Sequence, residues 1–431
     1  MDSQAPRAAF ASTAPLRTDE EIWPVIGLEA GRQEAQLELI ASENHASREV
    51  IAAMGTVLTN KYAEGYPGKR YYGGCEHVDT IERVARERLK SLYGASFANV
   101  QPHSGTQATL GALMALASPG DRVLAMSLDH GGHLSHGHPK NASGVFYEFA
   151  HYGVEQGTER IDFDRVRELA KEFQPKVLIS GGSAYPRTID FEAFGEIARE
   201  VGAKHLVDMA HVSGLVATGA HPSPVPYADA VASSTHKTLR GPRGGFVLSK
   251  KGVNKKINSA VFPGGQGGPL MHVIAAKAIA FREAASDEFK SYVDQVLENA
   301  RVLSATLTER GLRIVSGGTD NHLMLVDVGS VGLTGDVAEH ALHAVDITCN
   351  KNLIPFDQQP PVKASGIRLG MPALTTRGFD ADDTRQLGNW IADVLHAPTD
   401  ESVAKRVHGE VSELAAARPI YGDAPETLRI S

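Results

Sequence analysis

Two residues with chemically useful side chains follow predicted buried strands. Asp208 comes directly after the apolar run 205–207, and Lys237 follows the run 230–233 through Ser234-Thr235-His236. Ligands of open α/β sheets bind beyond the carboxyl ends of the strands, so we expect both side chains at a ligand site. Partial burial lowers the pKa of a lysine and makes its amine a nucleophile for a carbonyl carbon. An aspartate after a strand is equally often a helix cap. The pair, however, fits pyridoxal phosphate (PLP), which bonds to a lysine amine and needs a carboxylate beside its pyridine nitrogen.

A loop with the composition of a phosphate site lies earlier in the chain. A predicted strand at 96–100 leads into a tight loop at 101–106 and then a helix at 107–117. Such a loop presents free backbone N–H groups and the positive end of the helix to an anion. Serine and threonine caps are common, so the loop alone is weak evidence. Neither GxxxxGK[ST] nor a GxGxxG after a strand is present. Together with the lysine and the aspartate, the loop predicts a cofactor phosphate site at Ser104, Gly105 and Thr106.

Four histidines crowd the segment from His130 to His138, with glycines between them. Imidazoles at this density can ligate zinc. No cysteine, HExxH motif or carboxylate stands at metal spacing nearby, and the glycines favour a loop that wraps around a flat ligand. We therefore favour a histidine face stacked on a planar cofactor ring and expect no metal.

The segment from Ser234 to Lys237 also spells the S-x-x-K motif of penicillin-binding enzymes. The partner motifs S-D-N and K-T-G are both missing, which excludes that class.

The elements that hold these residues belong to a chain of ordinary globular composition. Its 431 residues suggest two or three domains, and 42% are apolar and 22% charged. A formal net charge of −8 argues against a nucleic-acid-coating surface or a polybasic membrane anchor. Two distant cysteines exclude a disulfide scaffold, and no apolar run reaches the ~18 residues of a membrane span. We expect a cytoplasmic protein whose residues 1–17 are a flexible arm.

Alternating apolar runs and helical segments predict the fold. Buried strands are expected at 96–100, 122–128, 176–180, 204–207, 229–232 and 245–248. Helices are expected between most of them, including 105–117, 162–173 and 191–201. Continuous apolar strands joined by helices are typical of a mostly parallel sheet covered on both faces. The predicted fold class is therefore α/β.

The rest of the chain predicts further units around this sheet. Before the sheet we expect a charged helix from about residue 19, a helix at 47–58, an irregular loop at 60–74 and an amphipathic helix at 79–93. After the sheet we expect a long helix at about 270–310, strands at 312–315 and 322–328, and helices at 334–344 and 380–396. The last group indicates a smaller α+β domain. We divide the chain into an N-terminal helical segment at 18–50, a large domain at 51–295 and a small domain at 296–431.

Several long segments carry distinctive residue patterns. They are Leu39-Ile40-Ala41-Ser42-Glu43-Asn44, the loop Asn60 to Gly74, Val207 to His211, Thr235 to Gly245, the glycine loop Phe262 to Pro269, and Ser365-Gly366-Ile367-Arg368. In these segments, and in their order from about residue 20 to 396, the chain resembles serine hydroxymethyltransferases. The resemblance implies a fold-type I PLP-dependent transferase with a mostly parallel seven-stranded sheet. It also implies a homodimer, or a tetramer built from two dimers, with shared active sites in which the segment 18–50 packs on the dimer.

The resemblance implies a role for individual residues. Lys237 would be the Schiff-base lysine, Asp208 the partner of the pyridine nitrogen, and His133 a ring stacked on the cofactor. Further cofactor contacts would come from Ser104, Gly105, Thr106, Ser183, His211, Ser234, His236, Tyr62 and, from the neighbouring subunit, Gly268. The substrate carboxylate would be held by Ser42 and Arg368. Tyr62, Glu64 and Tyr72 would reach the neighbour's active site, where Glu64 exchanges a proton and contacts folate. The folate pocket would be lined by Leu128, Gly132, Leu134 and Asn352.

The implied reaction interconverts serine and glycine, with tetrahydrofolate taking up the one-carbon unit as methylenetetrahydrofolate. Two alternatives stay open. A folate-independent aldolase for β-hydroxy amino acids is disfavoured by the presence of Glu64 and Asn352. An inactive family member that serves as a binding or structural subunit is disfavoured by the retention of Lys237 with its whole neighbourhood.

The chain departs from the family pattern close to the expected cofactor site. Ala232-Ser233-Ser234-Thr235 stands where the family has a run of threonines, and Ala364 and Met371 stand where threonines are common around Arg368. Smaller side chains could widen the substrate pocket and admit α-substituted serines such as α-methylserine. Neutral drift is the interpretation we prefer.

Overall fold

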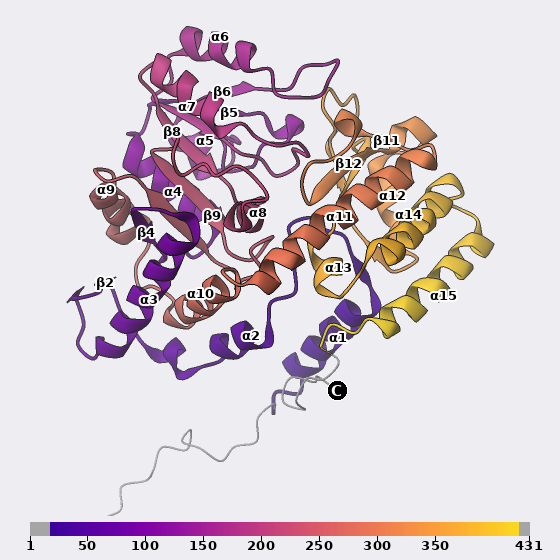
Figure 1. Ribbon diagram of the computed structural model, residues 1–431, viewed down its shortest axis with the longest axis horizontal. Helices are drawn as coiled ribbons and strands as arrows, with labels where there is room; N and C mark the ends of the chain where they lie inside the picture. Colours follow the sequence, from indigo (N-terminus) through magenta and orange to yellow (C-terminus); the bar gives the residue numbers. More distant parts are fainter. Residues whose placement is uncertain (1–17, 422–431) are drawn as a thin grey trace, which may run out of the picture.

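A seven-stranded sheet forms the larger part of the computed structural model, which describes residues 18–421 (Figure 1). Its strands are β4 (Phe97–Asn99), β5 (Arg122–Met126), β6 (Glu148–Tyr152), β7 (Val177–Ser180), β8 (Lys204–Asp208), β9 (Ala230–Ser234) and β10 (Gly245–Ser249). They lie in the order β4-β10-β9-β8-β7-β5-β6. Strand β10 runs in the direction opposite to that of the other six strands of this sheet. The predicted α/β fold with a mostly parallel sheet is confirmed. The predicted arm at 1–17 lies outside the described residues.

Helices cover both faces of this sheet. They are α3 (Glu76–Tyr93), α4 (Gly105–Leu116), α5 (Ala142–Phe146), α6 (Phe163–Phe173), α7 (Phe191–Glu200), α8 (Ser213–Thr218), α9 (Asn254–Ser259) and α10 (Met271–Glu283). On one face, the core contains Phe194, Phe246 and Phe281. On the other, Leu113 of α4 packs among strand residues such as Leu206. Side chains that alternate between two buried faces explain why these strands read as continuous apolar runs.

Two predictions about the helices are wrong, and one strand was not predicted. The expected helix at 270–310 is two helices, α10 and α11 (Asp287–Glu309), because the Ser286 hydroxyl accepts the Phe289 N–H at 3.2 Å and caps a new helix. The expected helix at 47–58 ends earlier, as α2 (Arg48–Met54) followed by a short 3₁₀ turn at Val57–Asn60. Strand β6 has no counterpart among the strands predicted from apolar runs, because it is an edge strand with polar residues.

The predicted irregular loop at 60–74 contains a short hairpin of β2 (Gly65–Tyr66) and β3 (Lys69–Arg70). Gly68 at its turn has φ +79°, a conformation that favours glycine. Arg70 holds the hairpin on the large domain through buried ion pairs with Asp79 at 2.9 Å and Glu82 at 2.7 Å.

A smaller α+β unit follows along the chain, as predicted. Its four-stranded antiparallel sheet has the order β11-β12-β15-β14, formed by Arg313–Ile314, Leu323–Asp327, Gly366–Gly370 and Asn350–Asn352. Helices α12 (Gly335–His343), α13 (Pro372–Thr376), α14 (Ala381–His396) and α15 (Glu401–Ala417) accompany it. Helix α11 crosses between the two units and contacts α8 and α14. Strand β1 (Leu37–Glu38) pairs in parallel with β13 (Ile347–Thr348), which ties the N-terminal segment to this smaller unit.

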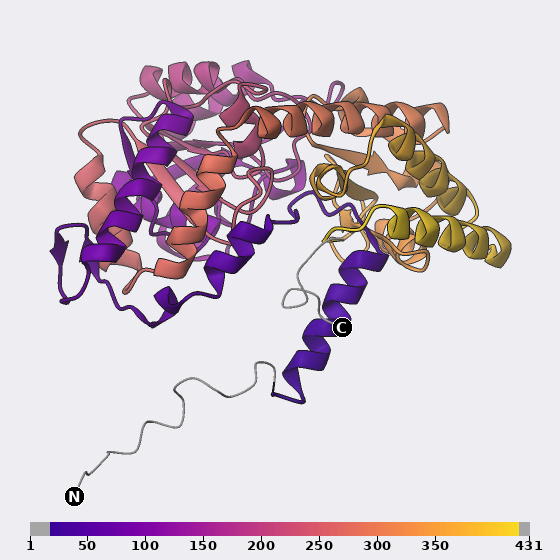
Figure 2. The ribbon, with the colours of Figure 1, turned by 60° about the horizontal axis from the view of Figure 1, so that its bottom comes forward.

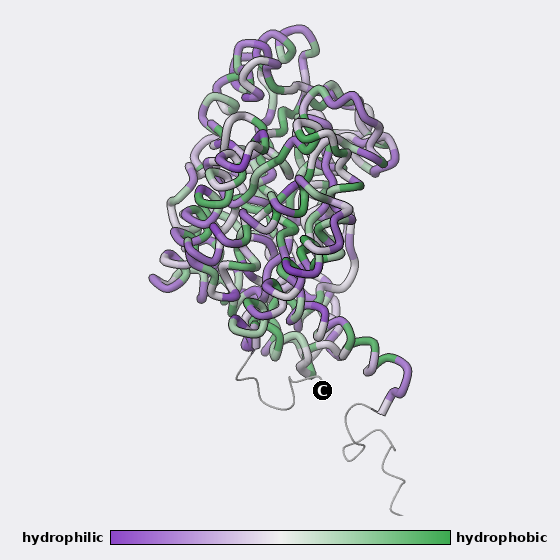
Figure 3. Tube along the Cα trace, turned by 90° about the vertical axis from the view of Figure 1, so that its right-hand side faces the viewer, coloured by the Kyte–Doolittle hydropathy of each residue, from purple (hydrophilic) through white to green (hydrophobic). Residues whose placement is uncertain are grey.

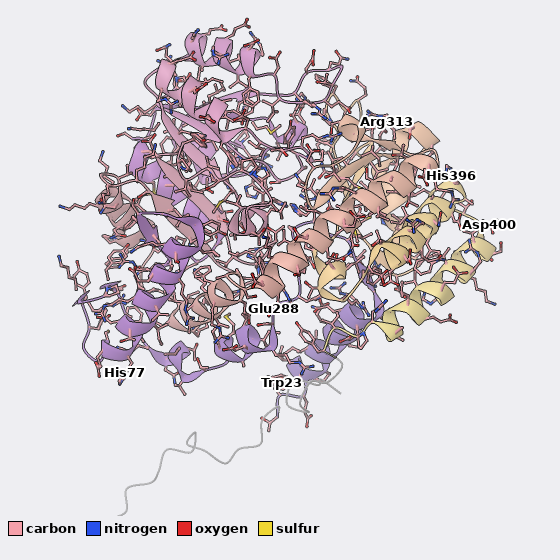
Figure 4. The ribbon with its side chains drawn as sticks, in the orientation of Figure 1. Trp23, His77, Glu288, Arg313, His396 and Asp400 are labelled. Carbon is pink, nitrogen blue, oxygen red and sulfur yellow. The ribbon has the colours of Figure 1, made fainter. Side chains whose placement is uncertain are left out.

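Ion pairs join the two units away from the core. Arg313, labelled at the outer edge of the smaller unit in Figure 4, lies 3.0 Å from Glu159 of the large unit. Arg187 of the large unit lies 2.9 Å from Asp320. These contacts, with α11, fix how the smaller unit faces the carboxyl ends of the large sheet.

Helix α1 (Ile22–Ala35) projects away from the rest of the chain (Figure 2). Within the described chain none of its residues is buried, and its exposed residues include the apolar Ile22, Val25 and Leu28. Figure 3 shows hydrophobic stretches along this projecting helix. Its C-terminal end is held by Arg377, which donates to the Gln36 carbonyl at 2.9 Å. No helix within residues 18–421 is long and apolar enough to cross a membrane.

Candidate active site

A cavity of about 430 Å³ opens beyond the carboxyl ends of β8 and β9, where the two units meet. Residues from distant parts of the chain line it. The predicted site residues among them are Ser42, Ser104, Gly105, Thr106, His133, Ser183, Asp208, His211, Ser234, His236, Lys237 and Arg368. The topology therefore brings most of the predicted cofactor and substrate residues into one space.

The Asp208 carboxylate lies at the base of this cavity, at the end of β8. One of its oxygens accepts hydrogen bonds from Thr109 Oγ1 at 3.2 Å and from His136 Nε2 at 3.1 Å, and the other accepts the Ala210 N–H at 3.0 Å. Burial alone would raise the pKa of Asp208. The hydrogen bond from His136 and the positive charges nearby outweigh it and hold that pKa below its usual range. The carboxylate is therefore ionised at neutral pH and able to hold a protonated ring nitrogen.

His133 lies beside the Asp208 carboxylate, on the segment 128–138, which we call the histidine loop. Burial lowers the pKa of His133 to about 4, so its ring is neutral at pH 7. Its Nδ1 accepts the Ser135 N–H at 3.1 Å, which fixes the orientation of the ring. A neutral, fixed imidazole in the cavity wall suits stacking on a flat ligand better than it suits a mobile acid.

His136 is a functional candidate that the sequence did not single out. It is buried, it lines the cavity, and it bonds directly to Asp208. Polar atoms of His133, His136 and Asp208 lie within 4.8 Å of one another, so they are a possible metal-ligand group within the described chain. Their hydrogen bonds to one another and to Ser135 already engage these atoms. Only the loop as a whole was noticeable in the sequence, because which histidine turns inward depends on the fold.

The amine of Lys237 projects into the cavity three residues after β9. Burial lowers the pKa of Lys237 to about 8, which Asp208 opposes and the Arg368 and Arg243 charges reinforce. Its backbone is held in place by Asn44, whose side-chain N–H donates to the Lys237 carbonyl at 3.0 Å. About a tenth of the amine is thus unprotonated at pH 7, far more than for a lysine with the ordinary pKa of 10.5, and the unprotonated amine is the nucleophile that an aldehyde requires.

One end of the cavity is built for an anion. The Ser104 hydroxyl caps α4 by accepting the Gln107 N–H at 3.2 Å, so the positive end of that helix faces the cavity. Ser234 Oγ and His236 Nδ1 are buried beside it with no hydrogen-bond partner among residues 18–421. A Cβ on Gly105 would lie 3.3 Å from the Ser234 side chain, so glycine allows the close approach of the loop to β9. Arg243, which was not predicted, lines the same cavity and adds positive charge.

The other end presents a guanidinium. Arg368, on β15, donates from Nη1 to the Ser183 carbonyl at 2.8 Å, and its buried Nε has no partner in the described part of the chain. Burial lowers the pKa of Arg368 to about 10, and it stays charged at neutral pH. Ser42 lines the same cavity. A planar cation with a free N–H, next to a hydroxyl, suits a carboxylate ligand.

His211 is backed by a second histidine that the sequence analysis missed. His211 Nδ1 lies 3.3 Å from Nε2 of His322, and the two rings stack with centroids 5.5 Å apart. Burial lowers the pKa of both, that of His322 to about 3. His322 lies just before β12, so only the docking of the smaller unit brings it against His211.

Comparison with protein families agrees with this arrangement. The family model described as serine hydroxymethyltransferase matches residues 16–391 of the chain. The chain belongs to the serine hydroxymethyltransferase family. Members of this family are fold-type I enzymes that use PLP, and the seven-stranded sheet is the fold expected of them. The unpartnered Ser234 Oγ and His236 Nδ1 beside the first turn of α4, the Lys237 amine and the Asp208 carboxylate fit the phosphate, aldehyde and ring nitrogen of PLP.

Four residues predicted from the family resemblance lie together outside the cavity. Tyr62 donates from its hydroxyl to Glu64 at 3.2 Å, and the centroid of its ring lies 5.1 Å from that of Tyr72. A Cβ on Gly268 would lie 3.3 Å from the Tyr62 ring. We call Tyr62, Glu64, Tyr72 and Gly268 the tyrosine cluster. Tyr62 is 55% and Tyr72 47% exposed. None of these four residues lines the cavity of its own chain.

The residues assigned to folate lie on two segments beside the cavity. Leu128 and Leu134 flank His133 on the histidine loop and are 43% and 48% exposed. On the same loop a Cβ at Gly132 would lie 2.3 Å from the Met126 carbonyl, so no larger residue fits there. Asn352 ends β14 and pairs with Gly366, two residues before Arg368. The histidine loop contacts the chain that follows β14, since the centroid of the His130 ring lies 4.6 Å from that of Phe356.

Proposed function

We propose that this chain is a folate-dependent hydroxymethyltransferase that interconverts L-serine and glycine. The observation that carries the proposal is the joint position of Lys237, Asp208 and Arg368 in one cavity. An amine, a carboxylate and a guanidinium there can bind an aldehyde, a protonated ring nitrogen and a substrate carboxylate. Family membership supports a reaction of the serine/glycine hydroxymethyltransferase type.

Each residue around the reacting amino acid has a separate role in the proposed reaction. Bound PLP supplies an electron sink for the pair released when the Cα–Cβ bond of serine breaks. Asp208 keeps the ring nitrogen protonated because its own carboxylate stays ionised. Arg368 and Ser42 hold the substrate carboxylate and so orient the bond that breaks. His133, neutral and fixed by Ser135, lines the cavity and would stack on the ring of the cofactor.

The second substrate would bind at the edge of the cavity. Leu128 and Leu134 offer exposed apolar surface next to His133, and Phe356 adds an aromatic ring close by. Asn352 provides an amide on the opposite segment. An apolar, partly aromatic rim with a polar amide suits the flat pteridine of tetrahydrofolate, and this supports folate as the acceptor.

The working unit we propose is a homodimer that shares its active sites. Glu64 is the proton-exchanging residue in this proposal, yet it lies in the exposed tyrosine cluster outside its own cavity. The apolar residues of the projecting α1 are also exposed. Both features are explained if a second copy covers α1 and receives Glu64, Tyr62 and Tyr72 at its cavity.

Steady-state kinetics on L-serine and α-methylserine, each with and without tetrahydrofolate, tests the proposal. We expect serine turnover that requires tetrahydrofolate and produces glycine, at least about tenfold more efficient than turnover of α-methylserine. Serine cleavage at the same rate without tetrahydrofolate would instead identify an aldolase. Protein that stays colourless after addition of PLP would support the inactive-subunit alternative.

A second candidate substrate, α-methylserine, is favoured by one observation. Of the positions where this chain departs from the family pattern, Ser234 is the one that lines the cavity. A serine there leaves more room than a threonine. If α-methylserine is the substrate, Ser234→Thr should reduce its turnover more than that of serine, with both measured at saturating PLP because Ser234 also lies at the anion end of the cavity. An equal effect on both substrates would remove this candidate.

A further inference from the structure

Lys277 carries a buried ammonium group that has no role in the proposed reaction. Lys277 lies on α10 and is 1% exposed. It donates to the backbone carbonyls of Val100 at 2.7 Å, Pro102 at 2.9 Å and Gly245 at 2.8 Å. A lysine ammonium has three N–H donors, so each is used on main chain and none on a side chain.

The three carbonyls belong to the backbone that shapes the anion end of the cavity. Val100 and Pro102 lie between β4 and Ser104, and Gly245 begins β10. The Gly245 N–H also donates to the Pro102 carbonyl at 3.0 Å, which closes the contact between the loop and the strand. Lys277 therefore binds both sides of the junction from which Ser104, Gly105 and the start of α4 face the cavity.

Two glycines leave the space that the Lys277 side chain and the loop occupy. A Cβ on Gly244 would lie 2.5 Å from Cε of Lys277, and a Cβ on Gly245 would lie 2.3 Å from the Ser104 carbonyl. Only glycines at these two positions let the lysine reach the loop and let the loop approach β10.

The charge of Lys277 has no carboxylate in contact with it in the described chain. Burial lowers the pKa of Lys277 to about 7, and Glu82 only partly opposes this. Glu82 is itself engaged by Arg70 at 2.7 Å and by Gln101 at 3.0 Å. Burying an unpaired cation is unfavourable unless a negative charge binds nearby.

We propose that Lys277 is the positioning residue of the phosphate loop, and that the phosphate of bound PLP balances its charge. The inference rests on PLP as the cofactor of the proposed function and is independent of which amino acid or folate the enzyme uses. It predicts that loss of Lys277 weakens the binding of ligands that carry the phosphate group.

The test compares PLP with pyridoxal, which has the same ring and aldehyde but lacks the phosphate. Dissociation constants are measured on the purified full-length apoprotein by fluorescence titration and equilibrium dialysis. For Lys277→Met we expect the dissociation constant of PLP to rise about tenfold or more and that of pyridoxal to change less than about threefold. Lys277→Gln, which keeps two donors without the charge, should show the same selectivity and provides a second variant if Lys277→Met does not fold.

Arg377→Met is the matched control. Arg377 is also buried and also donates to backbone carbonyls, including Gln36 and Ala415, but it lies at the ends of α1 and α15. We expect Arg377→Met to lower the unfolding temperature and to leave the ratio of the PLP and pyridoxal dissociation constants unchanged. Equal weakening of PLP and pyridoxal binding by both Lys277 variants, or no weakening of either, would overturn the proposal. Because no substrate is used, this outcome is distinct from a failure of the proposed reaction.

Discussion

The cavity and the tyrosine cluster both contain residues expected to act in one reaction, and they differ in how the chain surrounds them. In the cavity, buried groups such as Ser234 Oγ and Arg368 Nε are enclosed by protein and have no partner within residues 18–421. In the tyrosine cluster, the chemically active groups bond to one another and face outward. In the function we propose, small molecules complete the cavity, whereas a second protein surface covers the cluster.

The largest effect is expected from Lys237→Ala, which removes the amine from the cavity. Activity should fall about 10⁴-fold or more, since a covalent catalytic residue is lost. The wild-type protein reconstituted with PLP should be yellow and bleached by borohydride, and the variant should lose this behaviour. Absorbance spectra and activity assays check this, with circular dichroism to establish that the variant is folded. Retained activity would mean that the cavity is not the reaction site.

Glu64→Gln tests the cluster and should cost about 10²-fold or more in turnover, because a general acid–base group is lost. PLP binding should remain within about threefold of wild type, since the groups assigned to the phosphate, the aldehyde and the ring nitrogen of PLP are unchanged.

Mixed dimers of Glu64→Gln and Lys237→Ala chains sharpen the same comparison. If sites are shared, each mixed dimer contains one intact site, and random pairing should restore about a quarter of wild-type activity. No restoration in verified mixed dimers would show that Glu64 acts within its own chain.

Arg368→Lys should raise the KM for serine about a hundredfold, because a lysine cannot reproduce the bidentate hold of a guanidinium on a carboxylate. The colour of the PLP-bound protein should not change, since the amine and the phosphate end are untouched. Kinetics with serine and PLP titrations check the two halves of this prediction. An unchanged KM would place the substrate carboxylate elsewhere.

A moderate effect is expected from pH. The Lys237 amine must be unprotonated to bond to PLP, so the rate of bonding should rise with pH through about 8 and then level off. For a lysine with the ordinary pKa of 10.5, the rate would keep rising beyond that pH. In Asp208→Asn the midpoint should move lower, because the carboxylate that raises the lysine pKa is gone. Stopped-flow absorbance between pH 6 and about 10 measures both profiles.

The smallest effect is expected at the rim. Leu134→Ser removes part of the apolar surface beside His133 and should raise the KM for tetrahydrofolate about fivefold, with the KM for serine unchanged. A change in the serine KM alone would argue against folate binding at this rim.

Much of the cavity could be predicted from the sequence because its residues stand at positions set by local structure. Asp208 and Ser234 end apolar strands, and Ser104 caps a helix, so their types and their places along the chain already specify a common edge of a parallel sheet. The role of Arg368 came from the family resemblance instead, since its strand β15 was not predicted.

The sequence by itself determined the α/β sheet, the place of Lys237 after a buried strand and the composition of the loop before α4, because strand periodicity and helix capping depend on neighbouring residues. Only the tertiary structure decided that His136 turns toward Asp208, that His322 backs His211, and that Lys277 holds the phosphate loop. Their partners lie 72, 111 and 175 residues away along the chain. At such separations no local pattern records which polar groups meet, since that choice is made by how the two units and their helices pack.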